Sequence, residues 1–102
     1  LDPAVLRLIS RVIDAAHAAE KWAGLCGELA GRRRAIPVLL GLGLDEFSMT
    51  PQAIPEAKQI IRALTLSEAQ EIAQEALSMS TVAEVKTYLD SVLDDLELPQ
   101  EE

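Results

Sequence analysis

The chain has few of the residues that usually mark a chemical site. Its 102 residues include one cysteine, one histidine and three aromatic side chains. A single cysteine cannot form an internal disulfide, so the composition favours a reducing compartment, and we expect a cytoplasmic protein. The lone histidine, His17, has no second ligand one helical turn later, where Lys21 stands. We therefore interpret His17 as a partly exposed helix residue rather than a metal ligand.

Long apolar runs and excess positive charge are also missing. No apolar segment approaches the roughly 20 residues that a membrane-spanning helix needs, and the first residues do not resemble a secretory signal. The formal net charge of −8 disfavours nucleic acid and anionic lipid surfaces as partners. The first residue is Leu1 rather than Met, and we expect the chain to have been cut from a longer polypeptide.

What the sequence does contain is a folded, aliphatic composition. Apolar residues make up 49% of the chain, and alanine, leucine, isoleucine and valine dominate them. This length and composition fit a single domain with a modest core. The scarcity of aromatic residues favours helices packed against small strands over an all-β sandwich.

The first half of the chain alternates between helix and strand patterns. Asp2-Pro3 predicts the start of a helix over about residues 3–20. Residues 22–26 predict a short buried strand with Trp22 in the core, residues 35–42 a second helix, and residues 44–49 a second strand. Gly41 and Gly43 are the expected stop of the second helix. The first helix is expected to turn inward a stripe formed by Val5, Leu6, Ile9, Val12, Ile13 and Ala16.

Three further helices are predicted between Pro55 and about residue 96. Thr65 and Glu68 match a capping box, and Thr81 and Glu84 match another. The expected inward residues of the three helices are Ala57, Ile60, Ile61 and Leu64, then Leu66, Ala69, Ala73, Ala76 and Leu77, then Val82, Val85, Leu89, Val92 and Leu96. Residues 97–102 form an acidic tail that we expect to be disordered.

This order of elements indicates an α/β fold with parallel strands joined by helical crossovers. Two parallel strands expose edges that proteins normally cover. We therefore predict that residues 1–96 are a mostly helical, open piece of a larger α/β structure and tend to associate.

Three blocks carry a resemblance to a known family. They are residues 2–9 (DPAVLRLI), 24–31 (GLCGELAG) and 41–49 (GLGLDEFSM), with Ile54-Pro55 and residues 58–62 behind the third. In this order and spacing they resemble the C-terminal part of Enzyme I, the phosphoenolpyruvate-protein phosphotransferase of the bacterial sugar phosphotransferase system. Pyruvate phosphate dikinases and phosphoenolpyruvate synthases share the Cys-Gly element but differ around residues 28–31 and after Phe47, so they rank second.

The resemblance implies a fold and an activity. Residues 1–96 would form the last two strands and the following helices of a phosphoenolpyruvate-binding (β/α)8 TIM barrel. The whole enzyme would be a cytoplasmic, magnesium-dependent homodimeric transferase. It would move the phosphoryl group of phosphoenolpyruvate to a histidine on its N-terminal half, and then to HPr, for sugar transport. The magnesium ligands and this histidine would lie outside the present residues, so we expect the chain alone to be inactive.

The resemblance also implies that Cys26 protonates the enolate of pyruvate. A thiol with the ordinary pKa of about 8.5 is mostly protonated near neutral pH and can serve as a general acid. Gly27 and Glu28 are weaker candidates for substrate binding. Two other interpretations stay open for the chain: a helical interaction module without catalysis, or a redox sensor built on Cys26. For Arg32, Arg33 and Arg34 the alternatives are a solvated basic turn, or a group at the barrel mouth that steers anions.

Overall fold

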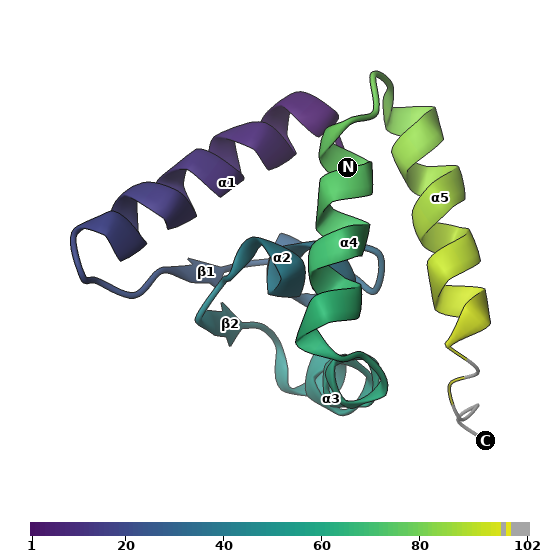
Figure 1. Cartoon of the computed structure of the whole chain (residues 1–102). Coiled ribbons are helices and arrows are strands. Elements are labelled where there is room, and N and C mark those ends of the chain that lie inside the picture. Colours follow the sequence, from purple (N-terminus) through teal and green to yellow (C-terminus); the bar gives the residue numbers. More distant parts are fainter. Residues whose placement is uncertain (97, 99–102) are drawn as a thin grey trace.

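The computed structural model describes residues 1–96 and 98. Helix, strand, helix, strand and three helices follow one another as predicted, with two short 3₁₀ turns between them (Figure 1). The elements are α1 (Pro3–Ala18), β1 (Gly24–Cys26), η1 (Leu29–Gly31), α2 (Ala35–Leu42), β2 (Glu46–Ser48), η2 (Pro51–Ala53), α3 (Ile54–Ala63), α4 (Leu66–Leu77) and α5 (Val82–Asp95). The predicted acidic tail, residues 97–102, lies outside the described residues except for Leu98.

The two strands pair in parallel, as the alternation of elements predicts. Leu25 of β1 is in register with Phe47 of β2, and Cys26 with Ser48. Leu25 and Phe47 are partly buried against the helices, while their strand neighbours face outward and are exposed. The prediction of a buried first strand is therefore wrong in part, because helices cover only one face of this sheet. Trp22 was expected in the core, but it precedes β1 and is 68% exposed.

Helix α2 is the centre of the fold. Its residues from Ala35 to Leu39 are all buried, including Pro37, which the first turn accommodates without losing a helical hydrogen bond. Each of the three core clusters contains a residue of α2. Val38 packs with residues of α1, α4 and α5, and Leu39 packs with residues of α1 and the sheet. Ile36 packs with residues of α3 and α5. A helix that is apolar all round has to be surrounded in this way.

Helix α1 uses a narrower face than the sequence predicts. Leu6 and Ile13 are fully buried, but Val5 and Val12, both expected to point inward, are exposed, Val12 at 65%. The guanidinium of Arg7 donates hydrogen bonds to the carbonyls of Leu77 and Met79, at 3.2 and 2.8 Å, and so joins α1 to the end of α4. The burial of Leu6 and Ile13 turns this side of α1 toward the core, and the Arg7 contacts are compatible with that orientation.

The later helices show the same partial agreement. Leu66 and Val82 were predicted to be inward, yet each occupies the first helical position and is exposed. Ile72 and Leu93 are buried although they were not predicted to be. Leu66 and Val82 both begin the first turn of their helix, and at that position the side chain extends beyond the part of the helix that packs against its neighbours.

The predicted caps are present with one difference. Thr65 and Glu68 form a complete capping box. At α5 the Thr81 hydroxyl accepts from the Glu84 amide, but the Glu84 carboxylate accepts from that same hydroxyl instead of a backbone N–H. Gly43 ends α2 with a φ of 96°, whereas Gly41 lies inside the helix and is not a stop.

Candidate active site

Cys26 stands at the carboxyl end of β1, beside Ser48 at the carboxyl end of β2. Both residues lie on the sheet face that the helices leave uncovered, and Cys26 is exposed. Because the strands are parallel, the loops that follow them leave from one edge of the sheet. The thiol therefore sits where two loops converge.

The loop after β1 begins with a change of backbone direction at Gly27. Its φ of 117° is one that side chains rarely adopt, and no atom lies within 4 Å of the position where a Cβ would stand. Its N–H donates to the carbonyl of Ser48 at 3.3 Å, which ties this loop to the end of β2. Glycine at this position is required by the backbone, with open space above it.

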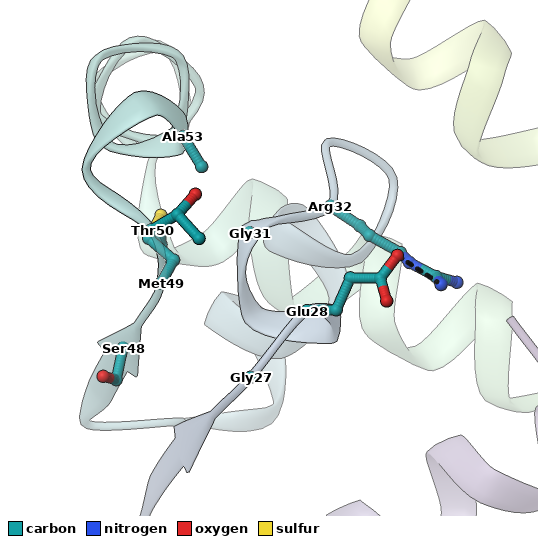
Figure 2. A pocket seen from close by; sticks show the side chains of 8 residues that line it. All are labelled: Gly27, Glu28, Gly31, Arg32, Ser48, Met49, Thr50 and Ala53. Carbon is teal, nitrogen blue, oxygen red and sulfur yellow. Dashed lines mark hydrogen bonds and ion pairs between the residues drawn. The ribbon is translucent and has the colours of Figure 1, made fainter.

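An open pocket of about 480 Å³ lies between the two loops (Figure 2). Its lining includes both predicted binding residues and several polar groups: Gly27, Glu28, Gly31, Arg32, Ser48, Met49, Thr50 and Ala53. Gly31 packs closely on the second loop, where an added Cβ would lie 3.2 Å from the Cβ atoms of Met49 and Ala53. Cys26 does not line this cavity. It borders a smaller hollow of about 290 Å³ with Trp22, Gly24, Leu25 and Glu46.

Glu28 has a partner that the sequence analysis did not assign. Its carboxylate accepts a hydrogen bond from the guanidinium of Arg32, four residues later, at 3.2 Å (Figure 2). The sequence analysis named Glu28 only as a weaker candidate for substrate binding. Both side chains are largely exposed, so the pair itself contributes little stability. A role for Gly27 or Glu28 in substrate binding stays a prediction.

The two other arginines of the basic turn reach distant helices. Arg33 contacts Glu56 of α3 at 3.0 Å, and Arg34 contacts Asp90 of α5 at 2.6 Å. The hydrogen bond between Arg34 and Asp90 raises the pKa of Arg34 and lowers the pKa of Asp90. Neither sequence-based alternative included these partners. The turn is a point of attachment, with its charges paired.

A second group of polar contacts was missed entirely. His17 is exposed, as predicted, but its Nε2 lies 2.8 Å from Oδ2 of Asp45. The same oxygen accepts from the Ala23 N–H at 2.8 Å. The Ala23 N–H first, and then His17, hold the pKa of Asp45 below its ordinary value. Because these residues are far apart in sequence, no local pattern could have connected them.

Metal and membrane sites are not evident in the part of the chain that the structure describes. Residues 1–96 and 98 contain no group of three or more histidine, cysteine, aspartate or glutamate side chains placed to hold a metal ion. The described residues therefore do not fit a magnesium site, and the magnesium ligands stay an expectation for residues other than these. None of the described helices combines the length and apolar character needed to cross a membrane.

Sequence comparison defines the class of protein to which this fold and site belong. The profile described as PEP-utilising enzyme, PEP-binding domain, matches residues 1–66, which include both strands and both loops of the cavity. The chain therefore belongs to the family of PEP-utilising enzymes.

Particular relatives narrow the comparison to phosphoenolpyruvate-protein phosphotransferases. The protein of that name from Staphylococcus carnosus is 52% identical over 84 residues, 82% of this chain and 15% of the relative. The one from Bacillus subtilis is 52% identical over 88 residues, 86% of this chain and 15% of the relative. The one from Haemophilus influenzae is 47% identical over 93 residues, which are 91% of this chain and 16% of the relative. These matches confirm the resemblance to Enzyme I, and the chain spans about one sixth of the relatives' length.

Proposed function

We propose that the chain is the C-terminal part of a phosphoenolpyruvate-protein phosphotransferase and that Cys26 protonates the enolate of pyruvate. The observation that carries this proposal is the position of an exposed thiol at the carboxyl end of a parallel strand, on the helix-free face of the sheet. Active sites of (β/α)8 barrels lie at the carboxyl ends of the strands. The similarity to phosphotransferases over most of the chain supports the same assignment.

The reaction leaves one proton transfer for this segment. The phosphoryl group of phosphoenolpyruvate moves to a histidine on the N-terminal half of the enzyme, and from there to HPr. Pyruvate enolate is left behind. The S–H bond of Cys26 breaks as a C–H bond forms at the methylene carbon, which gives pyruvate and a thiolate that water reprotonates. A neutral thiol suits this role because it adds no negative charge beside an anionic substrate.

The open sheet supports placement in a larger barrel. The two strands pair only with each other in the described part of the chain, so each has a free edge. In a (β/α)8 barrel, β1 and β2 would be the seventh and eighth strands, and strands from the rest of the enzyme would pair with both edges. The uncovered face, which carries Cys26, would then point into the barrel. The whole enzyme would be a magnesium-dependent cytoplasmic homodimer.

The test is replacement of Cys26 in the full-length enzyme. We expect Cys26→Ala to lower the turnover of phosphoenolpyruvate to pyruvate by roughly 10²- to 10⁴-fold, the usual contribution of a general acid. Phosphoenolpyruvate with deuterium at only the E or only the Z position of its methylene carbon, reacted in tritiated water, provides a second readout. The native enzyme should produce one configuration of the chiral methyl group, and the variant a mixture, because its enolate is protonated in solution.

Thr87→Ala, an exposed change on α5, is the control and should retain native turnover. Native turnover and native stereochemistry in Cys26→Ala would overturn the catalytic assignment. That result would favour the rival interpretation of this segment as a helical module without chemistry. The expected outcome is that Cys26→Ala lowers turnover and loses the single methyl configuration of the native product.

A further inference from the structure

We propose that the hollow between Trp22 and Glu46 receives an arginine or lysine side chain from the rest of the full-length enzyme. The hollow lies on the helix-free face of the sheet, next to Cys26. This inference rests on the proposed function, because that face would point into a completed barrel. It names the kind of residue that the remaining strands bring to this face.

The hollow is built by residues at alternate positions of the first strand segment. Side chains two positions apart in an extended chain point to the same side. Trp22, Gly24 and Cys26 have this spacing, and all three line the hollow together with Leu25 and Glu46. Gly24 has no side chain to fill the space between its two neighbours. The result is a hollow of about 290 Å³ with an indole, a thiol and a carboxylate at its wall.

The carboxylate of Glu46 reaches across the sheet toward this space. Glu46 is the register partner of Gly24. Its Cβ and Oε1 lie 3.4 and 3.5 Å from the position where a Cβ on Gly24 would stand. Within residues 1–96 and 98 this carboxylate forms no ion pair. The neighbouring Asp45 differs, because its carboxylate already contacts His17 and the Ala23 N–H.

A cation is the group that both walls of the hollow favour. Glu46 is exposed in this chain, but the strands of a barrel would exclude water from it. An ionised carboxylate without water or a partner is very costly to bury, and a cationic partner offsets that cost. Trp22 is 68% exposed, and the face of an indole attracts a guanidinium or an ammonium group. No arginine or lysine of the described residues lines the hollow, so the cation has to come from another segment.

The cation would also border Cys26, because the thiol shares the hollow. A positive charge alone beside a thiol favours the thiolate, which has no proton to give to the enolate. Glu46 offsets that charge, and the pair as a whole is neutral. The carboxylate therefore lets the proposed general acid keep its proton beside a cation.

The first test is the stability of the full-length enzyme. Glu46→Gln keeps the shape of the side chain and leaves the cation unpaired, so we expect the barrel to unfold about 5 °C or more below the native enzyme. Glu46→Asp retains the charge and should recover part of this loss. Glu71→Gln, the same change at an exposed position of α4, is the matched control and should have the native unfolding temperature. The loss should persist in EDTA, because the inferred cation is a side chain and not a metal ion.

The reactivity of Cys26 gives a second readout. The unpaired cation in Glu46→Gln favours the thiolate, and we expect iodoacetamide to alkylate Cys26 about 3- to 10-fold faster at pH 7. Glu71→Gln should leave this rate unchanged. Mass spectrometry of the peptide that contains Cys26 measures it.

The partner can be found by replacing, one at a time, each arginine and lysine at an inward position of the other barrel strands with Met. One replacement should lower the unfolding temperature of the native enzyme but cause no further loss in Glu46→Gln, because both changes break one contact. The same replacement should return the alkylation rate of Cys26 in Glu46→Gln to the native value. A variant that was merely loosened would not recover in this way.

Each outcome has a distinct meaning. A native unfolding temperature and native thiol reactivity in Glu46→Gln, with Cys26→Ala strongly impaired, would overturn this inference and leave the proposed function intact. Failure of every inward arginine and lysine to couple with Glu46 would also overturn it, even if Glu46→Gln is unstable. Native turnover in Cys26→Ala, with one cation coupled to Glu46, would overturn the catalytic assignment and support the cation in the hollow.

Discussion

At the scale of single residues, Gly41 shows how closely the central helices approach. It lies inside α2, opposite α4, and a Cβ at this position would be 1.9 Å from the carbonyl oxygen of Ala69 and 2.9 Å from the Cβ of Ala73. The pairing of α2 with α4 is the most extensive contact between elements. Small residues on both helices therefore let two backbones meet at the core of the fold.

Gly41→Ala should be strongly destabilising for this reason. The added methyl meets a backbone oxygen, which cannot move away as a flexible side chain could. Overpacking of this kind costs about 1–3 kcal/mol, and we expect the upper part of that range in urea unfolding. Gly24→Ala is the control, since its Cβ would meet Glu46 at an ordinary 3.4 Å. Equal midpoints for the two variants would show that α2 and α4 can separate at little cost.

Residue roles were predictable from the sequence only where the signal is local. Gly43 was identified as a helix stop from the apolar run that precedes it, and the structure confirms this. Gly41 was assigned the same role incorrectly, because its actual constraint is the approach of Ala69, 28 residues later. The partners of Arg33 and Arg34 were missed for the same reason. The importance of Cys26 came from resemblance, since a lone cysteine is usually a small buried apolar residue.

At the scale of elements, Asp45 connects α1 to the start of both strands. Its carboxylate contacts His17 near the end of α1 and the backbone N–H of Ala23 just before β1, while Asp45 itself precedes β2. The carbonyl of Ala23 in turn accepts from the amides of Asp45 and Glu46. These contacts align the two strands before their regular pairing begins.

This connection should make stability depend on pH in the acidic range. The pKa of Asp45 is lowered from its ordinary value of 3.8, chiefly by the Ala23 N–H and then by His17. A carboxyl with a lowered folded-state pKa stabilises the fold above the ordinary value, and the effect disappears as the pH falls through the lower one. We expect Asp45→Asn to unfold a few degrees below the native chain at pH 5–6. The difference should shrink steadily below about pH 4.

Thermal unfolding followed by circular dichroism at a series of pH values measures this difference. Asp14→Asn is the control for loss of a charge, because Asp14 is exposed on α1 and should unfold close to the native temperature. A difference between Asp45→Asn and the native chain that stays constant from pH 6 to pH 2 would contradict the assigned role of the ionised carboxylate.

The positions of the helices and strands were largely predictable from the sequence. Which side of each helix packs against the core was not. Asp2-Pro3 and the Thr65 capping box define helix starts with a few adjacent residues, and the structure places α1 and α4 accordingly. The strands are shorter than predicted because only Gly24–Cys26 and Glu46–Ser48 pair with each other, and the first two residues of each predicted run precede the paired region. The face that α1 buries is set by packing against distant elements, and Arg7 likewise contacts the end of α4, 70 residues or more away. Such contacts leave no periodic trace in the sequence.

At the scale of the whole molecule, apolar surface is left uncovered on α1 and just before β1. Val5, Leu8 and Val12 form an exposed row along α1, and Trp22 is exposed before β1. A different side of α1, which carries Leu6 and Ile13, packs against the core. The prediction of a piece of a larger structure agrees with these features, because a row of exposed large apolar side chains and the free edges of the two described strands both favour association.

Residues 1–102 produced as an isolated polypeptide should therefore associate. We expect the average mass from light scattering to rise with concentration above that of the 11.1 kDa chain. Leu8→Glu should lower that mass at a given concentration, because burying a carboxylate in an apolar contact is costly. Gln74→Glu, which makes the same charge change on the exposed side of α4, should not. A monomeric mass at every concentration, with one cooperative unfolding transition, would show that α1 and the sheet edges are stable in water. The piece would then be an independent domain, and the case for a barrel completed by other strands would weaken.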